Sequence, residues 1–143
     1  MNLKEALLLL NRLPHIGPRT IQKLLQYWPS PAELFSQSER QFMQAGFSER
    51  VAKSLTSANI DQIVPDLLWQ EMPRHRILMF ADPEYPDALK ELSDAPPVLY
   101  LSGSLDALQG IKLSIIGTRH PAAVGREAAF NFAYELGAHA ITI

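Results

Sequence analysis

The segment Leu113–Phe130 constrains the fold of this 143-residue chain more than any other part of the sequence. A short apolar run rich in β-branched residues ends there at Gly117, and apolar positions then recur at helical spacing over about residues 122–137. Such a run is typical of a buried strand in a parallel sheet, and the spacing after it predicts a helix. Because residues 138–143 favour a second strand, the pattern predicts a strand–helix–strand crossover.

The corner after the first predicted strand, Gly117–Arg119, is a candidate binding site. Crossovers of this kind are nearly always right-handed, and open sheets bind ligands at the carboxyl ends of their strands. We expect Gly117 to turn with positive φ and to let a ligand or another backbone approach closely. Arg119, beside glycine N–H groups and near a helix start, offers a guanidinium fork and a positive field to one phosphate. Thr118 adds a hydroxyl donor.

Composition excludes several other kinds of site. The chain has no cysteine, which removes disulfides, thiolate metal sites and thiol chemistry. Its four histidines show no metal-ligand spacing, so we expect neither a metal nor another cofactor. No apolar run reaches membrane-spanning length, and the first residues do not form a convincing signal peptide. We therefore expect a cytoplasmic protein with no membrane partner.

The charge distribution favours an anionic ligand at the ends of the chain. The net charge of −2 argues against a surface coated in base. Residues 1–60 nevertheless hold seven Lys or Arg against four acids, residues 61–106 hold three against nine, and residues 107–143 hold three against two. An anion would meet the two ends more readily than the middle.

The first residues predict two helices joined by a tight turn. Asn2 can cap a helix through Leu10, with Glu5 placed for a capping box. Two prolines then flank Gly17, and Pro18 suits the first position of a new helix.

This stretch, LPHIGPRTIQKLL, resembles the helix-hairpin-helix motif, whose glycine turn points backbone N–H groups at a nucleic-acid phosphate. The resemblance makes Gly17, Arg19 and Lys23 a possible secondary DNA contact. The usual motif has two glycines, and His15 stands where the first would be. A purely structural turn between helices is the alternative.

A second copy of the same pattern is centred on Gly46, which we pair with Gly17 of the first copy. Gly46 as a simple helix C-cap is the alternative. Ser48 can cap the helix that follows, and Asp61 is expected to start a further helix that ends at Pro73.

Beyond Pro73 the pattern changes to alternating strands and short helices. Residues 77–80 and 98–101 are expected strands, and Leu89 lies in a short helix between them. The predicted domain boundary falls there, giving domains 1–72 and 73–143.

Several segments over residues 75–143 resemble, in order, the DprA (Smf) family of DNA-processing proteins. They are Tyr85-Pro86, the stretch APPVLYLSG at residues 95–103, the stretch SIIGTR at residues 114–119, and Gly125 in the next helix. The family's G-S/T-R corner is matched directly by residues 117–119. Its later tyrosine-glycine pair is matched in half, because Val124 precedes Gly125.

The resemblance implies an α/β fold in which a helical SAM-like or helix-hairpin-helix domain, residues 1–72, precedes the first part of a Rossmann-like domain, residues 73–143, truncated at its end. It implies single-stranded DNA binding, loading of a RecA-type recombinase during natural transformation (competence) and recombination, and a homodimer in the full-length protein. It implies no established catalytic activity. The DNA-binding or phosphate-binding residues carried over are Gly117, Thr118, Arg119, Gly125 and Arg126, with no catalytic or metal-binding residue.

Three alternatives stay open at this point. A nucleotide-binding or nucleotide-hydrolysing Rossmann-like enzyme is one, although Gly117 lacks the spacing of the usual phosphate-binding loops. The N-terminal segment 1–60 can serve as a protein-interaction module rather than a DNA contact. Arg126 can lie on an exposed helix face rather than on phosphate. Since the sequence stops just after the second predicted strand, we also expect self-association, a remodelled sheet or a missing partner segment.

Overall fold

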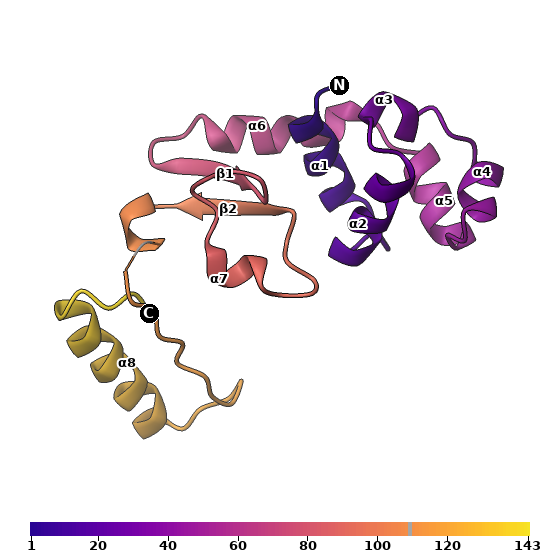
Figure 1. Ribbon diagram of the computed structural model, residues 1–143. Coiled ribbons are helices and arrows are strands. Elements are labelled where there is room, and N and C mark those ends of the chain that lie inside the picture. Colours follow the sequence, from indigo (N-terminus) through magenta and orange to yellow (C-terminus); the bar gives the residue numbers. More distant parts are fainter. Residues whose placement is uncertain (109) are drawn as a thin grey trace. The chain divides into compact units, whose positions relative to one another are not determined.

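The computed structural model describes residues 1–108 and 110–143, which fold into two compact units, Met1–Gly103 and Ser104–Ile143 (Figure 1). Helices dominate both units, and the first also holds a small sheet, so the chain is mixed α/β. In chain order the first unit contains α1 (Leu3–Arg12), α2 (Pro18–Tyr27), α3 (Pro31–Leu34), α4 (Glu39–Gln44), α5 (Glu49–Thr56), the 3-10 helix η1 (Ile60–Ile63), α6 (Val64–Gln70), β1 (His75–Met79), α7 (Asp87–Lys90) and β2 (Val98–Ser102). The second unit contains the 3-10 helix η2 (Leu105–Leu108) and α8 (Ala123–Ala138).

The first helices begin where their capping residues predict. The Asn2 side chain accepts a hydrogen bond from the Glu5 amide at 2.9 Å, and the Glu5 carboxylate accepts one from the Asn2 amide at 2.8 Å. Pro18 occupies the first turn of α2, and the Ser48 hydroxyl caps α5 by accepting from the Val51 amide at 3.4 Å. These predictions are confirmed, because each depends on groups that are close neighbours in the sequence.

The turn before α2 and the turn before α5 have the same backbone conformation at equivalent positions. His15 has φ +65° and Gly46 has φ +83°, both in the left-handed region. Gly17 and Ser48 follow these two residues as the N-caps of α2 and α5. The repeat therefore pairs His15 with Gly46 and Gly17 with Ser48, and the predicted pairing of Gly17 with Gly46 is wrong. Gly46 also lies just past the end of α4, as a C-cap glycine does.

The helix expected to start at Asp61 begins differently. The Asn59 side chain accepts from the Asp61 amide at 3.0 Å and starts η1, and α6 follows with Pro65 in its first turn. Its expected apolar face is partly exposed, with Leu68 at 59%, whereas Asp66 is only 5% exposed. The orientation of α6 follows from a long-range ion pair of Asp66 that local periodicity does not contain.

The strands β1 and β2 form an antiparallel pair with His75 opposite Ser102 and Met79 opposite Val98. Both strands, and the short helix α7 between them, lie close to the predicted positions. Ile77, Met79 and Val98 belong to the same hydrophobic cluster as the buried side chains of α1 to α5, including Leu8 and Leu24. The predicted boundary near Pro73 thus falls inside the first compact unit, and the assignment of domains 1–72 and 73–143 stays a prediction.

The second unit confirms the predicted helix and corrects the predicted strands. Helix α8 covers Ala123–Ala138, but residues 113–116 and 138–143 form no regular strand. One isolated parallel bridge joins Lys112 and Thr142, with Leu113 N donating to Thr142 O and Thr142 N to Ile111 O, both at 2.9 Å. A strand needs continuous partners on a neighbouring strand, and here the pairing stops after one bridge. The run before Gly117 is consequently exposed.

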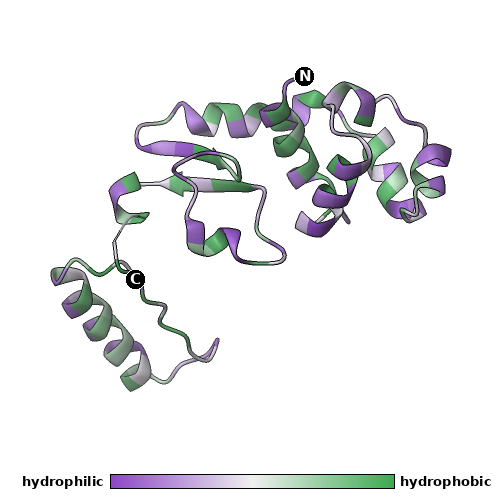
Figure 2. Ribbon diagram, in the orientation of Figure 1, coloured by the Kyte–Doolittle hydropathy of each residue, from purple (hydrophilic) through white to green (hydrophobic). Residues whose placement is uncertain are grey.

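Apolar side chains remain accessible along this unit. Figure 2 shows hydrophobic residues recurring along α8 and along the segment that precedes it. Ile116 is 92% exposed, Val124 76%, and Phe130 and Tyr134 69% each. Exposed apolar surface of this kind marks places where another polypeptide segment can pack.

Within residues 1–108 and 110–143, no helix combines the length and hydropathy needed to cross a membrane. The same described residues contain no group of three or more His, Asp or Glu side chains placed to hold a metal ion.

Candidate nucleic-acid interface

The corner Gly117–Arg119 lies between the exposed apolar run and the start of α8. The prediction that Gly117 turns with positive φ is wrong, because the glycines of the described chain with positive φ are Gly46 and Gly103. A Cβ atom added at Gly117 would meet nothing within 4 Å. The fold of this unit does not itself require a glycine there, and the space in front of the backbone is open to a ligand.

Four of the five predicted DNA-binding residues line one open hollow of about 410 Å³. They are Gly117, Thr118, Gly125 and Arg126, together with Ile115, Ile116, Pro121 and Ala129. Arg119 is not part of the lining, although it follows directly on the lining residue Thr118 in the sequence. The Thr118 hydroxyl oxygen accepts from the His120 amide at 3.3 Å, which leaves the hydroxyl proton able to donate.

The electrostatics at this hollow favour an anion. The side chains of Arg119 and Arg126 are exposed and make no hydrogen bond or ion pair with any residue that the structure describes. Helix α8 begins at the hollow, and its N-cap residue Ala122 provides no side-chain cap for the amides of the first turn. Arg126 and the positive end of a 16-residue helix dipole therefore lie at one hollow, and Arg119 follows its lining residue Thr118 in the sequence. The arrangement can hold a phosphate group.

Of the residues predicted as a secondary DNA contact, Gly17 and Arg19 lie together in the structure and Lys23 does not. Gly17 and Arg19 line a hollow of about 360 Å³, but Asp94 lines it as well and repels an anion. Arg19 Nη2 donates to the Ser93 hydroxyl at 2.9 Å.

Lys23 is directed elsewhere, towards the α4–α5 turn. Its Nζ atom donates to the Gly46 carbonyl at 3.4 Å and lies 4.7 Å from the centre of the Phe47 ring. Lys23 is therefore engaged within the protein, and Asp94, which no local sequence signal connects to Gly17, weakens the case for a phosphate at this turn.

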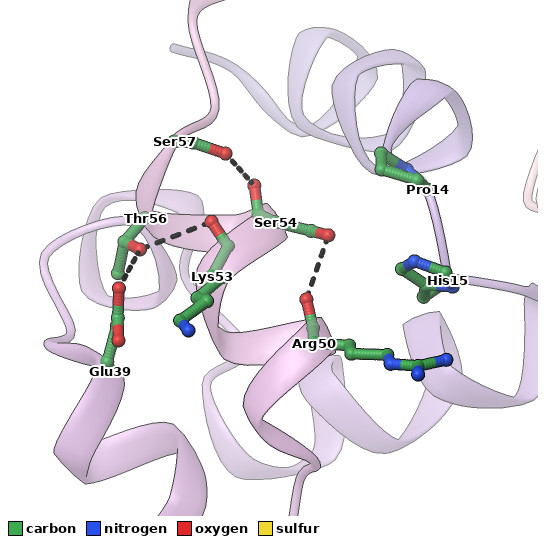
Figure 3. Close-up of a pocket in the computed structure, with 8 residues that line it drawn as sticks. All are labelled: Pro14, His15, Glu39, Arg50, Lys53, Ser54, Thr56 and Ser57. Atoms are coloured by element: carbon green, nitrogen blue, oxygen red, sulfur yellow. Dashed lines mark hydrogen bonds between the residues drawn. The ribbon is translucent and has the colours of Figure 1, made fainter.

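Sequence reasoning missed a further hollow of about 540 Å³ in the first unit (Figure 3). His15 lies on one side of it, and Arg50 and Lys53 of α5 lie on the other. Arg19 and Arg50 have the same separation along the chain as His15 and Gly46, and this shared spacing is the sequence signal that could have identified the hollow.

Comparisons with known proteins match the part of the chain that contains the first hollow. Residues 76–143 match the family model described as DNA recombination-mediator protein A. Over 100 residues, 70% of this chain, the sequence is 29% identical to Protein Smf of Escherichia coli (strain K12). The matched stretch spans 27% of the length of that relative. These matches support the DprA/Smf family resemblance that the ordered motifs of residues 75–143 indicate.

Proposed function

We propose that this chain binds single-stranded DNA at the hollow formed by Gly117, Thr118, Gly125 and Arg126, and through Arg119, the residue after Thr118. The binding serves DNA processing in recombination, and in natural transformation it precedes loading of a RecA-type recombinase on the bound strand. The observation that supports the proposal is that Arg126 lines the hollow and Arg119 directly follows its lining residue Thr118. Both side chains are exposed, have no partner among the described residues and lie within the segment that matches the family model. A single strand offers the phosphates that such a site can hold.

We further propose that residues 73–143 form the N-terminal part of a Rossmann-like domain. The parallel bridge between Lys112 and Thr142, on either side of α8, supports a strand–helix–strand crossover that is only partly formed. For residues 1–72 we propose a helix-hairpin-helix or SAM-like domain. The two turns with left-handed His15 and Gly46 support it.

The DNA-binding proposal is tested by fluorescence anisotropy with labelled oligonucleotides and the full chain. Single strands should bind more tightly than duplex, and binding should weaken as salt rises. Arg119→Ala should remove one phosphate contact, which lowers the slope of log K against log salt by about 0.7 and weakens binding about fivefold at about 0.1 M salt. Lys112→Ala, which removes a cation bonded to the Gly110 carbonyl at 3.0 Å, is the matched control and should leave both quantities unchanged.

Equal affinities of the two variants and the unmodified chain would refute Arg119 as a contact. A marked rise in melting temperature with a nucleotide, without binding of single strands, would instead favour a nucleotide-binding enzyme.

The proposed partners need separate measurements. Co-purification with a RecA-type recombinase in the presence of single-stranded DNA tests the loading function. The exposed Ile116, Phe130 and Tyr134 side chains support self-association, which light scattering over a range of concentrations measures directly. A constant monomer mass would refute a dimer built on this surface.

A further inference from the structure

The hollow between the α1–α2 turn and α5 has a chemistry that the site on α8 does not account for. We propose that it is a second contact for the phosphate backbone of single-stranded DNA, with Arg50 as the main cation. The proposal rests on the single-strand binding proposed above, and it places an additional contact in the helical part of the chain rather than at the Gly17 turn.

The internal repeat puts Arg19 and Arg50 at equivalent positions, the second residue of α2 and of α5. The two side chains nevertheless have different surroundings. Arg19 donates to the Ser93 hydroxyl and shares its hollow with Asp94. Arg50 is exposed, and its guanidinium makes no hydrogen bond or ion pair with any residue in the described part of the chain. Of the two equivalent arginines, Arg50 has its donors available for a ligand.

Figure 3 shows the Arg50 side chain extending along the hollow below His15, with Lys53 one turn along the same helix. His15 lies in the turn between α1 and α2, where the chain reverses direction, and its φ is +65°. The hollow is therefore bounded by the α1–α2 turn, by Glu39 of α4 and by α5, which carries two cations. An extended anionic chain can lie between the turn and α5.

Two acids lie near the cations of the hollow. Glu49 pairs with Lys53 at 2.5 Å, whereas Glu39 lines the hollow and keeps its negative charge, because the Thr56 hydroxyl that donates to it at 3.2 Å is neutral. The pair with Glu49 raises the pKa of Lys53 and keeps it cationic, but it shares that charge with a carboxylate. Arg50 is thus the lining cation without an ion-pair partner among the described residues, and because Glu39 also lines the hollow we expect it to hold one phosphate rather than several.

The other lining groups favour the DNA backbone over its bases. The Ser54 hydroxyl donates to the Arg50 carbonyl at 2.9 Å, and the Ser57 hydroxyl donates to the Ser54 carbonyl at 3.2 Å. These hydroxyls are directed at the helix itself. No Phe, Tyr or Trp is among the described residues that line the hollow, so the large aromatic rings on which successive bases usually stack do not line it. Contact through a guanidinium alone is independent of base sequence.

The test compares Arg50→Gln with Arg40→Gln in the full chain, using anisotropy of a long labelled oligothymidylate. Arg40 is an exposed arginine of α4 that does not line the hollow, so both variants lose one positive charge from neighbouring helices. Arg50→Gln should weaken binding about fivefold at about 0.1 M salt and reduce the salt slope by about 0.7, whereas Arg40→Gln should change neither. Circular dichroism of both variants confirms that they are folded.

A second measurement follows the backbone amides of Ser54 and Ser57 by NMR during titration with the same oligonucleotide. These signals should shift in the Arg119→Ala variant as well, because the two contacts are separate. Equal binding by the Arg50 and Arg40 variants, with unshifted Ser54 and Ser57 amides, would overturn the second contact and leave the α8 site intact. If a polyglutamate peptide shifts these amides and the oligonucleotide does not, the hollow binds acidic peptides and the proposal is wrong. Absence of single-strand binding by the unmodified chain would overturn both sites.

Discussion

Replacing Arg12 by Met should destabilise the first unit more than replacing Asp66 by Asn, although each change breaks the same ion pair. Arg12 lies on α1 and Asp66 on α6, and the guanidinium makes two hydrogen bonds to the carboxylate, at 2.5 Å and 2.8 Å. The two halves differ in exposure. The side chain of Asp66 is 6% exposed, whereas that of Arg12 is 39% exposed. The cost of each substitution depends on which charge is left behind.

The structure sets the expected magnitudes. In Arg12→Met the buried Asp66 carboxylate loses both guanidinium donors and its counter-charge, and a buried charge left without its ionic partner costs about 3 kcal/mol. In Asp66→Asn the remaining guanidinium can be solvated, and the amide oxygen still accepts one hydrogen bond. The loss is then that of one ordinary hydrogen bond, about 1 kcal/mol. A difference of about 2 kcal/mol between the variants is the quantity to measure.

Urea denaturation followed by tryptophan fluorescence measures this difference in the free energy of unfolding. Both tryptophans of the chain, Trp28 and Trp69, lie in the first unit, so the signal reports that unit alone. Lys53→Met is the matched control. It breaks the pair with Glu49, whose side chains are 60% and 65% exposed, and water screens such an i,i+4 pair so well that the urea midpoint should barely move. If Asp66→Asn costs as much as Arg12→Met, the argument from the buried half of the pair is refuted.

Two further predictions concern the same unit. Burial raises the pKa of Tyr100 to about 12, with hydrogen bonding to Asp66 adding to the rise, so the folded state holds this proton more tightly than the unfolded state. That contribution to stability is complete below about pH 10 and is lost as the pH rises towards 12. Between these pH values, thermal melts should show a smaller fall in melting temperature for Tyr100→Phe than for the unmodified chain. Equal falls in melting temperature would contradict the prediction. Gly46→Ala should destabilise by about 1 kcal/mol because φ is +83°, while His15→Gly, at φ +65°, should be neutral or slightly stabilising; urea titrations that give both changes the same sign would refute the strain argument.

The helices of the first unit could be predicted because their signals are local. The capping box of Asn2 and Glu5 joins residues within one helical turn, and Pro18 and Ser48 each fix a helix start over a similar distance. The error at Asp61 has the same local scale, since Asn59 is an equally good cap shortly before it and η1 precedes α6. Such signals find helices reliably and leave their exact starts open.

The strands of the second unit could not be predicted with the same means. Residues 113–116 have the composition of a buried strand, but composition says nothing about which segment supplies the hydrogen bonds. In the structure the partner segment gives a single bridge, Lys112 with Thr142, and Ile116 stays 92% exposed. For the same reason the burial of Asp66 could not be predicted, because its ion-pair partner Arg12 is distant in the sequence.

The candidate site on α8 shows which part of a site a motif can predict. The prediction groups Gly117, Thr118, Arg119, Gly125 and Arg126, and in the structure all of these except Arg119 line one hollow. The backbone reason offered for Gly117 was wrong, because its φ is not positive. A glycine that the local fold does not need, with open space before it, is more consistent with close approach of a ligand than with a turn.

The two helix-turn-helix copies of the first unit also have different surroundings despite their common register. Arg19 of the first copy contacts Ser93, in the segment between α7 and β2, and Lys23 contacts the turn of the second copy through Gly46. These cations therefore link the first copy to other parts of the same unit. Arg50 of the second copy makes no such link within the described residues and borders an open hollow. At the repeated arginine position, Arg19 thus joins segments of the fold, whereas Arg50 is available to an external anion. The comparison of Arg50→Gln with Arg40→Gln is therefore a sharper test of DNA contact in this unit than a substitution of Arg19.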